Sequence, residues 1–278
     1  MAITQRESEQ VESANTSGHT PVVFIHGLWL LPSSWQRWEQ LFQEAGFAAL
    51  TPSWPDDPET VEQARANPDV FAGKTVGQVA DHVAEVIGGL TAKPVVVGHS
   101  FGGLLAQITA GRGLSAATVA IDPAPFRGVL PLPISSLRSA MPVLGNPANR
   151  KRAVTLTFDQ FRYGWANAVS EAEARQLHDE FHVAAPGAPL FQAALANLNP
   201  FTEAKVPDHG DRGPLLLISG GADHTVPLAI TKASFKRQHR HYGVTEIIEV
   251  PNRGHALTID SGWREVADTA LTFIKRFV

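Results

Sequence analysis

The chain has 278 residues and no cysteine, which excludes disulfides, thiolate catalysis and cysteine-ligated metals. Its net charge of −4 offers no basic footprint for nucleic acid, and no apolar run approaches the ~20 residues that a membrane helix needs. Residues 1–19 are polar and lack the apolar stretch of a signal peptide. We therefore expect a flexible tail over 1–19, a cytoplasmic protein, and neither nucleic acid nor a membrane as a partner.

Short apolar runs then alternate with helical patterns. The candidate strands are residues 21–27, 47–54, 93–100, 116–123, 213–223 and 244–252. Most of these runs are continuously apolar, which is typical of strands covered on both faces in a parallel sheet. The main helical patterns cover residues 33–46, 75–90, the stretch after Ser100, and 262–278. This alternation predicts a doubly wound α/β fold with a mostly parallel sheet of about six strands.

The alternation breaks between residues 124 and 212, a region with many prolines and several aromatic side chains. One helix pattern is clear there, because Ser170 is a good cap and Glu173 stands three residues later. The sheet pattern resumes at residue 213. We therefore expect 20–123 and 213–278 to form the core, and 124–212 to be an inserted, mainly helical cap over the strand ends.

Ser100 stands in the pentapeptide Gly98-His99-Ser100-Phe101-Gly102, a G-x-S-x-G pattern. The pattern by itself is weakly specific. The alternative is a glycine-rich turn between a strand and a helix, in which the serine has no catalytic role. Here an apolar strand precedes the serine and a helical pattern follows it at once, which is the setting of a nucleophile elbow. The context predicts that Ser100 is a nucleophile.

A serine hydroxyl is a poor nucleophile unless a base takes its proton. His255 follows the last predicted strand, at the carboxyl edge of the sheet where Ser100 also lies. His99 is next to Ser100, but neighbours on a tight turn point apart. We therefore expect His255 to be the base.

The base needs a carboxylate that fixes its tautomer and stabilises its charged form. Asp122 and Asp223 both end strands after Ser100, and either could be an ordinary turn residue. Asp223 keeps the order serine, aspartate, histidine along the chain and lies on a longer loop. It is the predicted acid, with Asp122 as the alternative.

Two backbone N–H groups are expected to bind a developing oxyanion. One belongs to Phe101, at the start of a helix, and the other to Leu28, after the first strand. Trp29 is expected to wall the substrate pocket, with a core position as its alternative. Aromatic residues of the insertion are expected to line the same pocket: Phe126, Phe158, Phe161 and Trp165.

The motifs "HGLW", "GHSFGG", "GGADHTVP" and "NRGHAL", in this order and spacing, resemble those of the α/β-hydrolase fold family. The resemblance covers roughly residues 20–123 and 213–278. It implies Ser100 as nucleophile, Asp223 as acid and His255 as base, and a cap that shapes substrate choice. The family's usual first two strands find little support in the polar N-terminus. A shortened sheet would then leave an edge exposed or covered by another chain.

These features predict a hydrolase of small, mostly apolar carboxylic esters that acts through an acyl-enzyme, with no cofactor and no metal. Lactones and thioesters are chemically close and stay open as substrates. Two alternatives use the same residues. The first is another reaction, either carbon–carbon bond hydrolysis or cofactor-free peroxidation. The second is a small-ligand receptor that hydrolyses its ligand slowly. Haloalkane and epoxide hydrolysis are disfavoured because those relatives carry an aspartate nucleophile.

Overall fold

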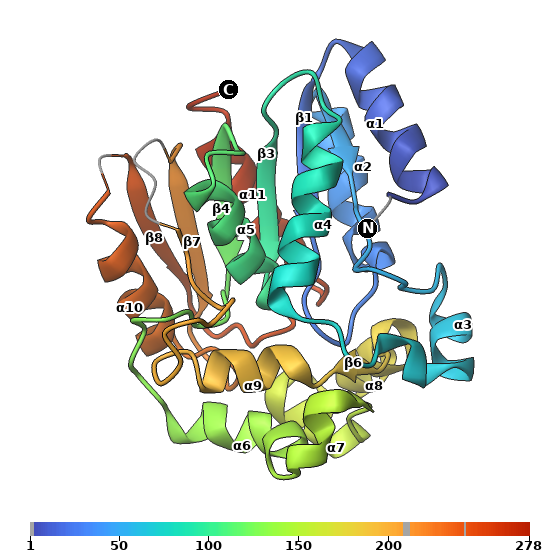
Figure 1. Cartoon of the computed structure of the whole chain (residues 1–278), viewed down its shortest axis with the longest axis vertical. Helices are drawn as coiled ribbons and strands as arrows, with labels where there is room; N and C mark the ends of the chain where they lie inside the picture. Colours follow the sequence, from blue (N-terminus) through green and yellow to red (C-terminus); the bar gives the residue numbers. More distant parts are fainter. Residues whose placement is uncertain (1–2, 208–211, 242) are drawn as a thin grey trace.

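A six-stranded parallel sheet forms the centre of the computed structural model, which describes residues 3–207, 212–241 and 243–278 (Figure 1). The strands lie in the order β2-β1-β3-β4-β7-β8, and every neighbouring pair is parallel. Their bounds are β1 (Thr20–Ile25), β2 (Phe47–Leu50), β3 (Val95–His99), β4 (Ala117–Ile121), β7 (Leu215–Gly220) and β8 (Thr245–Val250). The predicted doubly wound sheet of about six strands is confirmed.

Alternate side chains of each strand enter different layers, because successive residues of a strand point to opposite faces. Val22 and Phe24 pack on one face with α2 (Gln36–Glu44) and α11 (Trp263–Ile274). Val23 and Ile25 pack on the other face. The helices on that face are α1 (Gln5–Ser17), α4 (Val76–Gly88), α5 (Phe101–Gly111) and α10 (Leu228–Gln238).

The connections reverse direction between β1 and β3, since β1 leads to β2 on one side and β3 leads to β4 on the other. Ligands of open α/β sheets bind at such a switch point, outside the carboxyl ends of the strands. Ile25 and Gly98 are paired there. The sequence after each of these strands therefore faces the site: Gly27 after β1 and Ser100 after β3.

The predicted flexible tail is wrong. Residues Gln5–Ser17 form α1, whose N-terminus is closed by a capping box between Thr4 and Glu7. Val11 and Ala14 are buried in the core, and the helix packs beside β2 and α4. The helix thus lies along the sheet edge that was expected to be exposed or covered by another chain. Residues 1–2 lie outside the described residues.

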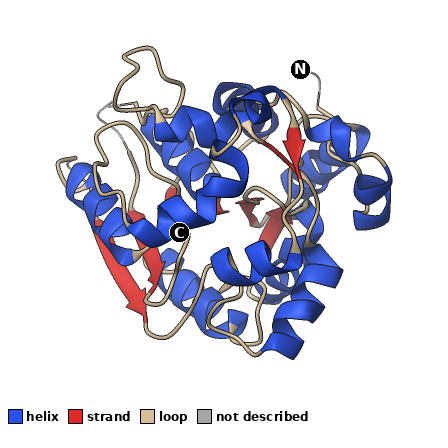
Figure 2. Ribbon diagram, turned by 90° about the horizontal axis from the view of Figure 1, so that it is seen from below, coloured by secondary structure: helices blue, strands red, loops and turns tan. Residues whose placement is uncertain are grey.

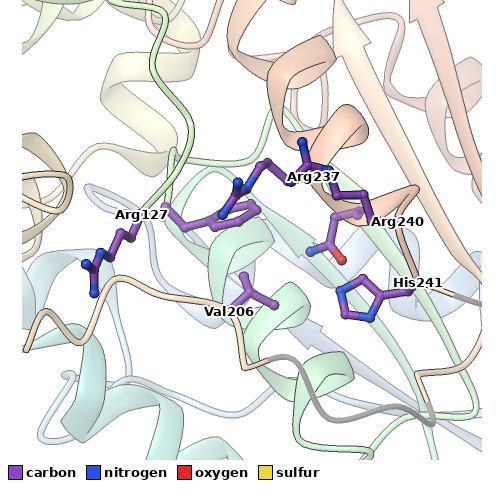
Figure 3. A pocket seen from close by; sticks show the side chains of 7 residues that line it. Arg127, Val206, Arg237, Arg240 and His241 are labelled. Carbon is purple, nitrogen blue, oxygen red and sulfur yellow. The ribbon is translucent and has the colours of Figure 1, made fainter. Parts of the chain in front are cut away.

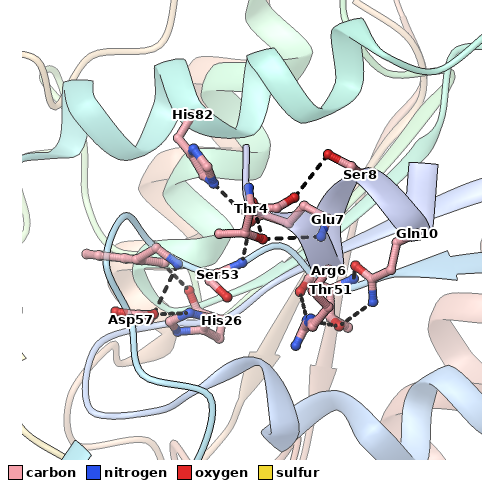
Figure 4. Close-up of polar contacts among 11 residues, drawn as sticks. Thr4, Arg6, Glu7, Ser8, Gln10, His26, Thr51, Ser53, Asp57 and His82 are labelled. Carbon is pink, nitrogen blue, oxygen red and sulfur yellow. Dashed lines mark hydrogen bonds and ion pairs between the residues drawn. The ribbon is translucent and has the colours of Figure 1, made fainter. Parts of the chain in front are cut away.

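Glu7 ties α1 to the core through a buried polar cluster (Figure 4). Its carboxylate accepts hydrogen bonds from Ser53 N at 3.0 Å and Thr4 N at 2.7 Å, and lies 2.9 Å from His82 Nε2. Burial raises the pKa of Glu7, but the hydrogen bonds from His82 and Thr4 outweigh it and lower the pKa to about 2. The carboxylate is therefore charged and fully engaged.

The insertion (residues 124–212) lies between β4 and β7 and is mainly helical, at the lower end of the sheet in Figure 1. Figure 2 looks onto this end of the molecule. Residues 208–211 of the insertion lie outside the described residues. Its elements are α6 (Ile134–Leu144), β5 (Ala153–Val154), α7 (Phe158–Gly164), α8 (Glu171–Phe181), β6 (Ala185–Pro186) and α9 (Ala188–Ala194).

The remaining elements are short: α3 (Val61–Ala66), η1 (Pro32–Trp35), η2 (Pro68–Phe71) and η3 (Pro147–Lys151). In the described part of the chain, none of the helices combines the length and the apolarity that crossing a bilayer requires.

Replacing Glu7 by Gln should destabilise the protein at pH 7 by about 1–3 kcal/mol, because buried donors lose a charged acceptor. Folding lowers the pKa of Glu7 from 4.5 to about 2. The stabilisation is therefore complete above pH 4.5 and is lost as the pH falls toward 2. The difference in unfolding free energy between wild type and Glu7→Gln, measured by denaturant titration, should shrink over that window. Glu12→Gln, on an exposed position of α1, is the control. A pH-independent difference would contradict the charged contact.

Candidate active site

The turn that carries Ser100 is as short as a strand-to-helix turn can be. β3 ends at His99 and α5 begins at Phe101, so Ser100 alone makes the turn, with φ 57° and ψ −120°. A Cβ atom on Gly98 would lie 2.0 Å from the Gly102 carbonyl oxygen. Only glycine allows this approach, and the resulting turn holds the serine in a strained backbone conformation at the strand ends.

Ser100, His255 and Asp223 come together in one hydrogen-bonded chain. His255 Nδ1 lies 2.6 Å from Asp223 Oδ2, and His255 Nε2 lies 3.0 Å from Ser100 Oγ. Because a carboxylate only accepts, Nδ1 carries the proton and Nε2 is left to accept from the serine hydroxyl. The side chains are buried, and His255 has no exposed surface. The three residues singled out in the sequence thus adopt the arrangement needed for nucleophilic catalysis.

Asp223 is held by its own loop. Its second oxygen, Oδ1, accepts hydrogen bonds from the N–H groups of Thr225 at 2.6 Å and Val226 at 2.9 Å. The neighbouring Ala222 N donates to Arg253 O at 2.9 Å, which links this loop to the one that carries His255. Both oxygens of Asp223 are therefore occupied, and the carboxylate cannot rotate away from the histidine without losing these bonds.

Asp122 lies beside this chain of hydrogen bonds but has another partner. Its Oδ1 accepts from Gly220 N at 2.8 Å, and its backbone adopts a φ of 39°. Burial, and then the charge of Asp223, raise the pKa of Asp122 well above its usual range. These causes favour the neutral form of Asp122. The histidine bonds Asp223, as predicted, and Asp122 takes no part in that bond.

His99 packs against the ring of His255 and does not reach the serine hydroxyl. The two imidazole centroids lie 4.7 Å apart, and Trp165 closes the group at 5.5 Å from His99 and 4.7 Å from His255. Burial, and then the proximity of His255, hold the pKa of His99 well below its usual range, so its ring stays neutral. The sequence did not indicate these contacts, because His99 and His255 lie far apart along the chain and Trp165 reaches them from the insertion.

A further grouping that the sequence did not indicate is a possible metal-ligand set. Within the described residues, ligand atoms of His99, Asp122 and His255 lie within 4.8 Å of one another. Both ring nitrogens of His255 are already engaged by Asp223 and Ser100. Because His255 has no free ring nitrogen, the three residues make a poor metal site. That the protein uses no metal stays a prediction.

The two predicted oxyanion donors lie around Ser100. Gly27 packs against the serine, since a Cβ atom there would lie 2.8 Å from Ser100 Cβ. Among the described residues, the N–H of Leu28 has no hydrogen-bond acceptor. The N–H of Phe101, in the first turn of α5, has no carbonyl of its own helix to bind. Both groups are therefore available to a bound oxygen.

Two residues that the sequence did not indicate, Trp54 and Asp57, support the loop that carries Leu28. His26 Nε2 lies 3.1 Å from buried Asp57 Oδ2, and Trp54 Nε1 donates to His26 O at 3.2 Å. Burial raises the pKa of Asp57, and the bond from His26 opposes this. Only the pair His26-Gly27 at the end of a strand signalled this region, because the partners come from a distant loop.

An apolar cavity opens at Ser100. It occupies about 880 Å³ including its mouth and is bordered by Trp29, Ser100 and Phe101. Its other walls come from α6, α9 and the start of α10, and include Leu132, Leu137, Ala140, Leu144, Leu190 and Val226. Trp29 thus walls the cavity as expected. A cavity of this lining favours an uncharged, apolar ligand.

The other predicted pocket aromatics are placed elsewhere, and that prediction is wrong for all four. Phe126 lines a separate basic pocket with Arg127, Arg237, Arg240 and His241 (Figure 3). Neither Phe158 nor Phe161 lines the Ser100 cavity, because their rings pack against His178 of α8. Trp165 is buried behind His255, away from the cavity. Phe161 and Trp165 are buried behind the site, and Phe158 is partly buried beside α8.

Comparisons with known proteins agree with this architecture. The structure resembles the monoacylglycerol lipase of Paleococcus ferrophilus, with a TM-score of 0.63 and 18% identity over 93% of this chain and 95% of that one. An extracellular alpha/beta-hydrolase from a Paenibacillus species gives 0.65 and 20% over 91% and 98%. A pyrethroid hydrolase from Sphingobium faniae JZ-2 gives 0.64 and 15% over 91% and 96%. At these identities the likeness shows the fold.

A search of curated proteins finds no match. A family model, described as the alpha/beta hydrolase family, matches residues 22–269. The match runs from β1 to α11 and includes the turn at Ser100 and the loops of Asp223 and His255. The chain therefore belongs to the alpha/beta hydrolase family.

Proposed function

We propose that the protein is a serine hydrolase that cleaves carboxylic esters with apolar acyl groups. The observation that carries the proposal is the chain of hydrogen bonds from Asp223 through His255 to Ser100, which ends in an apolar cavity. The names of two structural relatives, a monoacylglycerol lipase and a pyrethroid hydrolase, are in line with it. Lactones and thioesters share the reacting carbonyl and stay within the proposal.

In the first half of the reaction, Ser100 Oγ attacks the carbonyl carbon while His255 Nε2 takes its proton. Asp223 stabilises the imidazolium that forms, through the bond to Nδ1. The N–H groups of Leu28 and Phe101 donate to the oxyanion. The histidine then gives its proton to the leaving alcohol, and the acyl group remains on the serine.

In the second half, His255 takes a proton from water, whose oxygen attacks the acyl carbon, and returns that proton to Ser100 Oγ as the acid leaves.

The neutral state of His99 favours the protonation of His255 in both halves of the reaction. A charged neighbour 4.7 Å away would disfavour the imidazolium, and burial prevents that charge from forming.

The receptor alternative differs in rate and not in geometry. A receptor would hydrolyse its ligand at most once or very slowly, whereas the full set of donors and acceptors around Ser100 favours repeated turnover. Multiple-turnover assays with a panel of esters, lactones and amides separate the two.

A fluorophosphonate probe should label Ser100 with one adduct per chain, because the probe needs an activated serine. Ser100→Ala should abolish labelling, keep the fold, and lower turnover by roughly 10³–10⁶-fold. Ser136→Ala is the matched control, since Ser136 lines the same cavity. Peptide mapping that places the adduct on Ser136, or on any other residue, would overturn the nucleophile assignment.

Asp223→Asn and Asp122→Asn should have very different effects. Loss of the Asp223 carboxylate leaves His255 without its orienting acceptor and should lower kcat by about 10⁴-fold. The surroundings of Asp122 favour its neutral form, and Asn reproduces the hydrogen-bonding capacity of that form and tolerates its left-handed backbone. We expect Asp122→Asn to keep kcat within about tenfold of wild type. An inactive, folded Asp122→Asn with an active Asp223→Asn would show that the acid lies on β4.

A further inference from the structure

Large apolar side chains are exposed around the mouth of the Ser100 cavity. Ile134, Leu198 and Phe201 are 84%, 81% and 88% exposed. Among the described residues outside the insertion, the most exposed large apolar side chain is Val278, at 43%. We name the set the apolar rim. It consists of Leu130, Leu132, Ile134, Leu137, Met141, Leu195, Leu198 and Phe201.

The two halves of the rim form one surface. The first half belongs to α6 and the segment before it, and the second follows α9, which packs against α6. Asn197 bridges them, because its Nδ2 donates to Val129 O at 2.9 Å and its Oδ1 accepts from Gly128 N at 2.7 Å. Arg127 N donates to Ala204 O at 2.9 Å. These bonds hold together the two segments that carry the rim.

The rim is continuous with the cavity. Leu132 and Leu137 belong to both, and Ala193 and Ala194 line the cavity directly before Leu195 of the rim. A contiguous exposed apolar patch of this kind marks an interaction surface. Its position means that whatever covers the rim also faces the entrance to Ser100.

The segment that carries the first half of the rim has charges of one sign. Residues 123–158 contain five basic residues and no acidic one, although the whole chain carries a net charge of −4. The basic residues are Arg127, Arg138, Arg150, Lys151 and Arg152. Residues 182–202 carry no Asp, Glu, Lys or Arg, and the next residue, Glu203, is bonded to Gly77 N and Gln192. An apolar surface flanked by cations fits an anionic amphiphile layer.

We propose that the apolar rim inserts into the surface of anionic lipid aggregates, so that ester substrates pass from the lipid layer into the Ser100 cavity. The binding of the rim to lipid, here called the docking half, is argued from the rim alone. The passage of ester substrates into the cavity, the substrate half, rests on the proposed function. Such docking needs no membrane-spanning helix. It revises the expectation, taken from the sequence, that the protein has no membrane partner.

Vesicle flotation tests the docking half without any chemistry. The full chain is mixed with vesicles of diether phosphatidylcholine, with or without 30% diether phosphatidylglycerol, which contain no ester to cleave. We expect strong binding to the anionic vesicles and weak binding to the neutral ones. Added salt should weaken the binding, since each basic residue near the surface contributes roughly fivefold.

Variants test whether the rim is the docking surface. Ile134→Ser, Leu198→Ser and Phe201→Ser should together lower vesicle binding by at least roughly tenfold. None of the three lines the cavity, so hydrolysis of a soluble short-chain ester should not change. Ile248→Ser, at an exposed position of the edge strand β8, is the matched control and should bind like wild type.

Three outcomes would overturn the docking proposal. These are no binding of wild type to anionic vesicles, unchanged binding by the triple variant, or a wild-type dimer that the triple variant converts to a monomer. The last would assign the rim to a second copy of the chain. Failure of the proposed function has a different signature, because wild type would then bind vesicles yet leave soluble esters uncleaved.

Discussion

The backbone of Ser100 is the constraint on which the site depends. A residue with φ 57° and ψ −120° persists only where its surroundings hold it. Here β3 and α5 meet so closely that Gly98 touches the Gly102 carbonyl, and Gly102 touches the carbonyl of Ile25 in β1. The same packing brings Gly27 against the serine. Side chains at these glycines would push the strands and α5 apart and move Ser100 Oγ away from His255.

The insertion is tied to the loops around the site. Trp29 Nε1 donates to Val154 O at 2.9 Å, and Val183 N donates to Trp29 O at 3.1 Å, beside the proposed oxyanion donor Leu28. The segment after α7 reaches the other two loops, because Ala256 N donates to Trp165 O and Asn167 Nδ2 donates to Ala222 O. This part of the insertion therefore clamps the loops of His255 and Asp223. Only its other side, at α6 and α9, borders the cavity.

The sequence predicted what is encoded locally. Short apolar runs, most of them continuous, located all six strands of the sheet, and the order of strand-end residues pointed to Ser100, Asp223 and His255. The predictions that failed concern features that depend on tertiary contacts. The capping box of α1 is visible in the sequence, but the helix depends on the buried contact between Glu7 and His82, which lies far along the chain. The aromatic rings of α7 looked suited to a pocket, yet their burial depends on α8 and on the rear wall of the site. Asp122 and Asp223 differ in role because burial, and then the neighbouring Asp223, raise the pKa of Asp122, which no local pattern reveals.

The most direct measurement is acid-quench mass spectrometry during turnover of a p-nitrophenyl ester. The activated leaving group makes formation of the acyl-enzyme fast, so that its hydrolysis limits the rate and the intermediate accumulates. We expect a burst of one p-nitrophenolate per chain and a mass increase equal to one acyl group on the peptide that contains Ser100. Steady turnover with the acyl group on another residue, or with neither burst nor adduct on Ser100, would contradict the account.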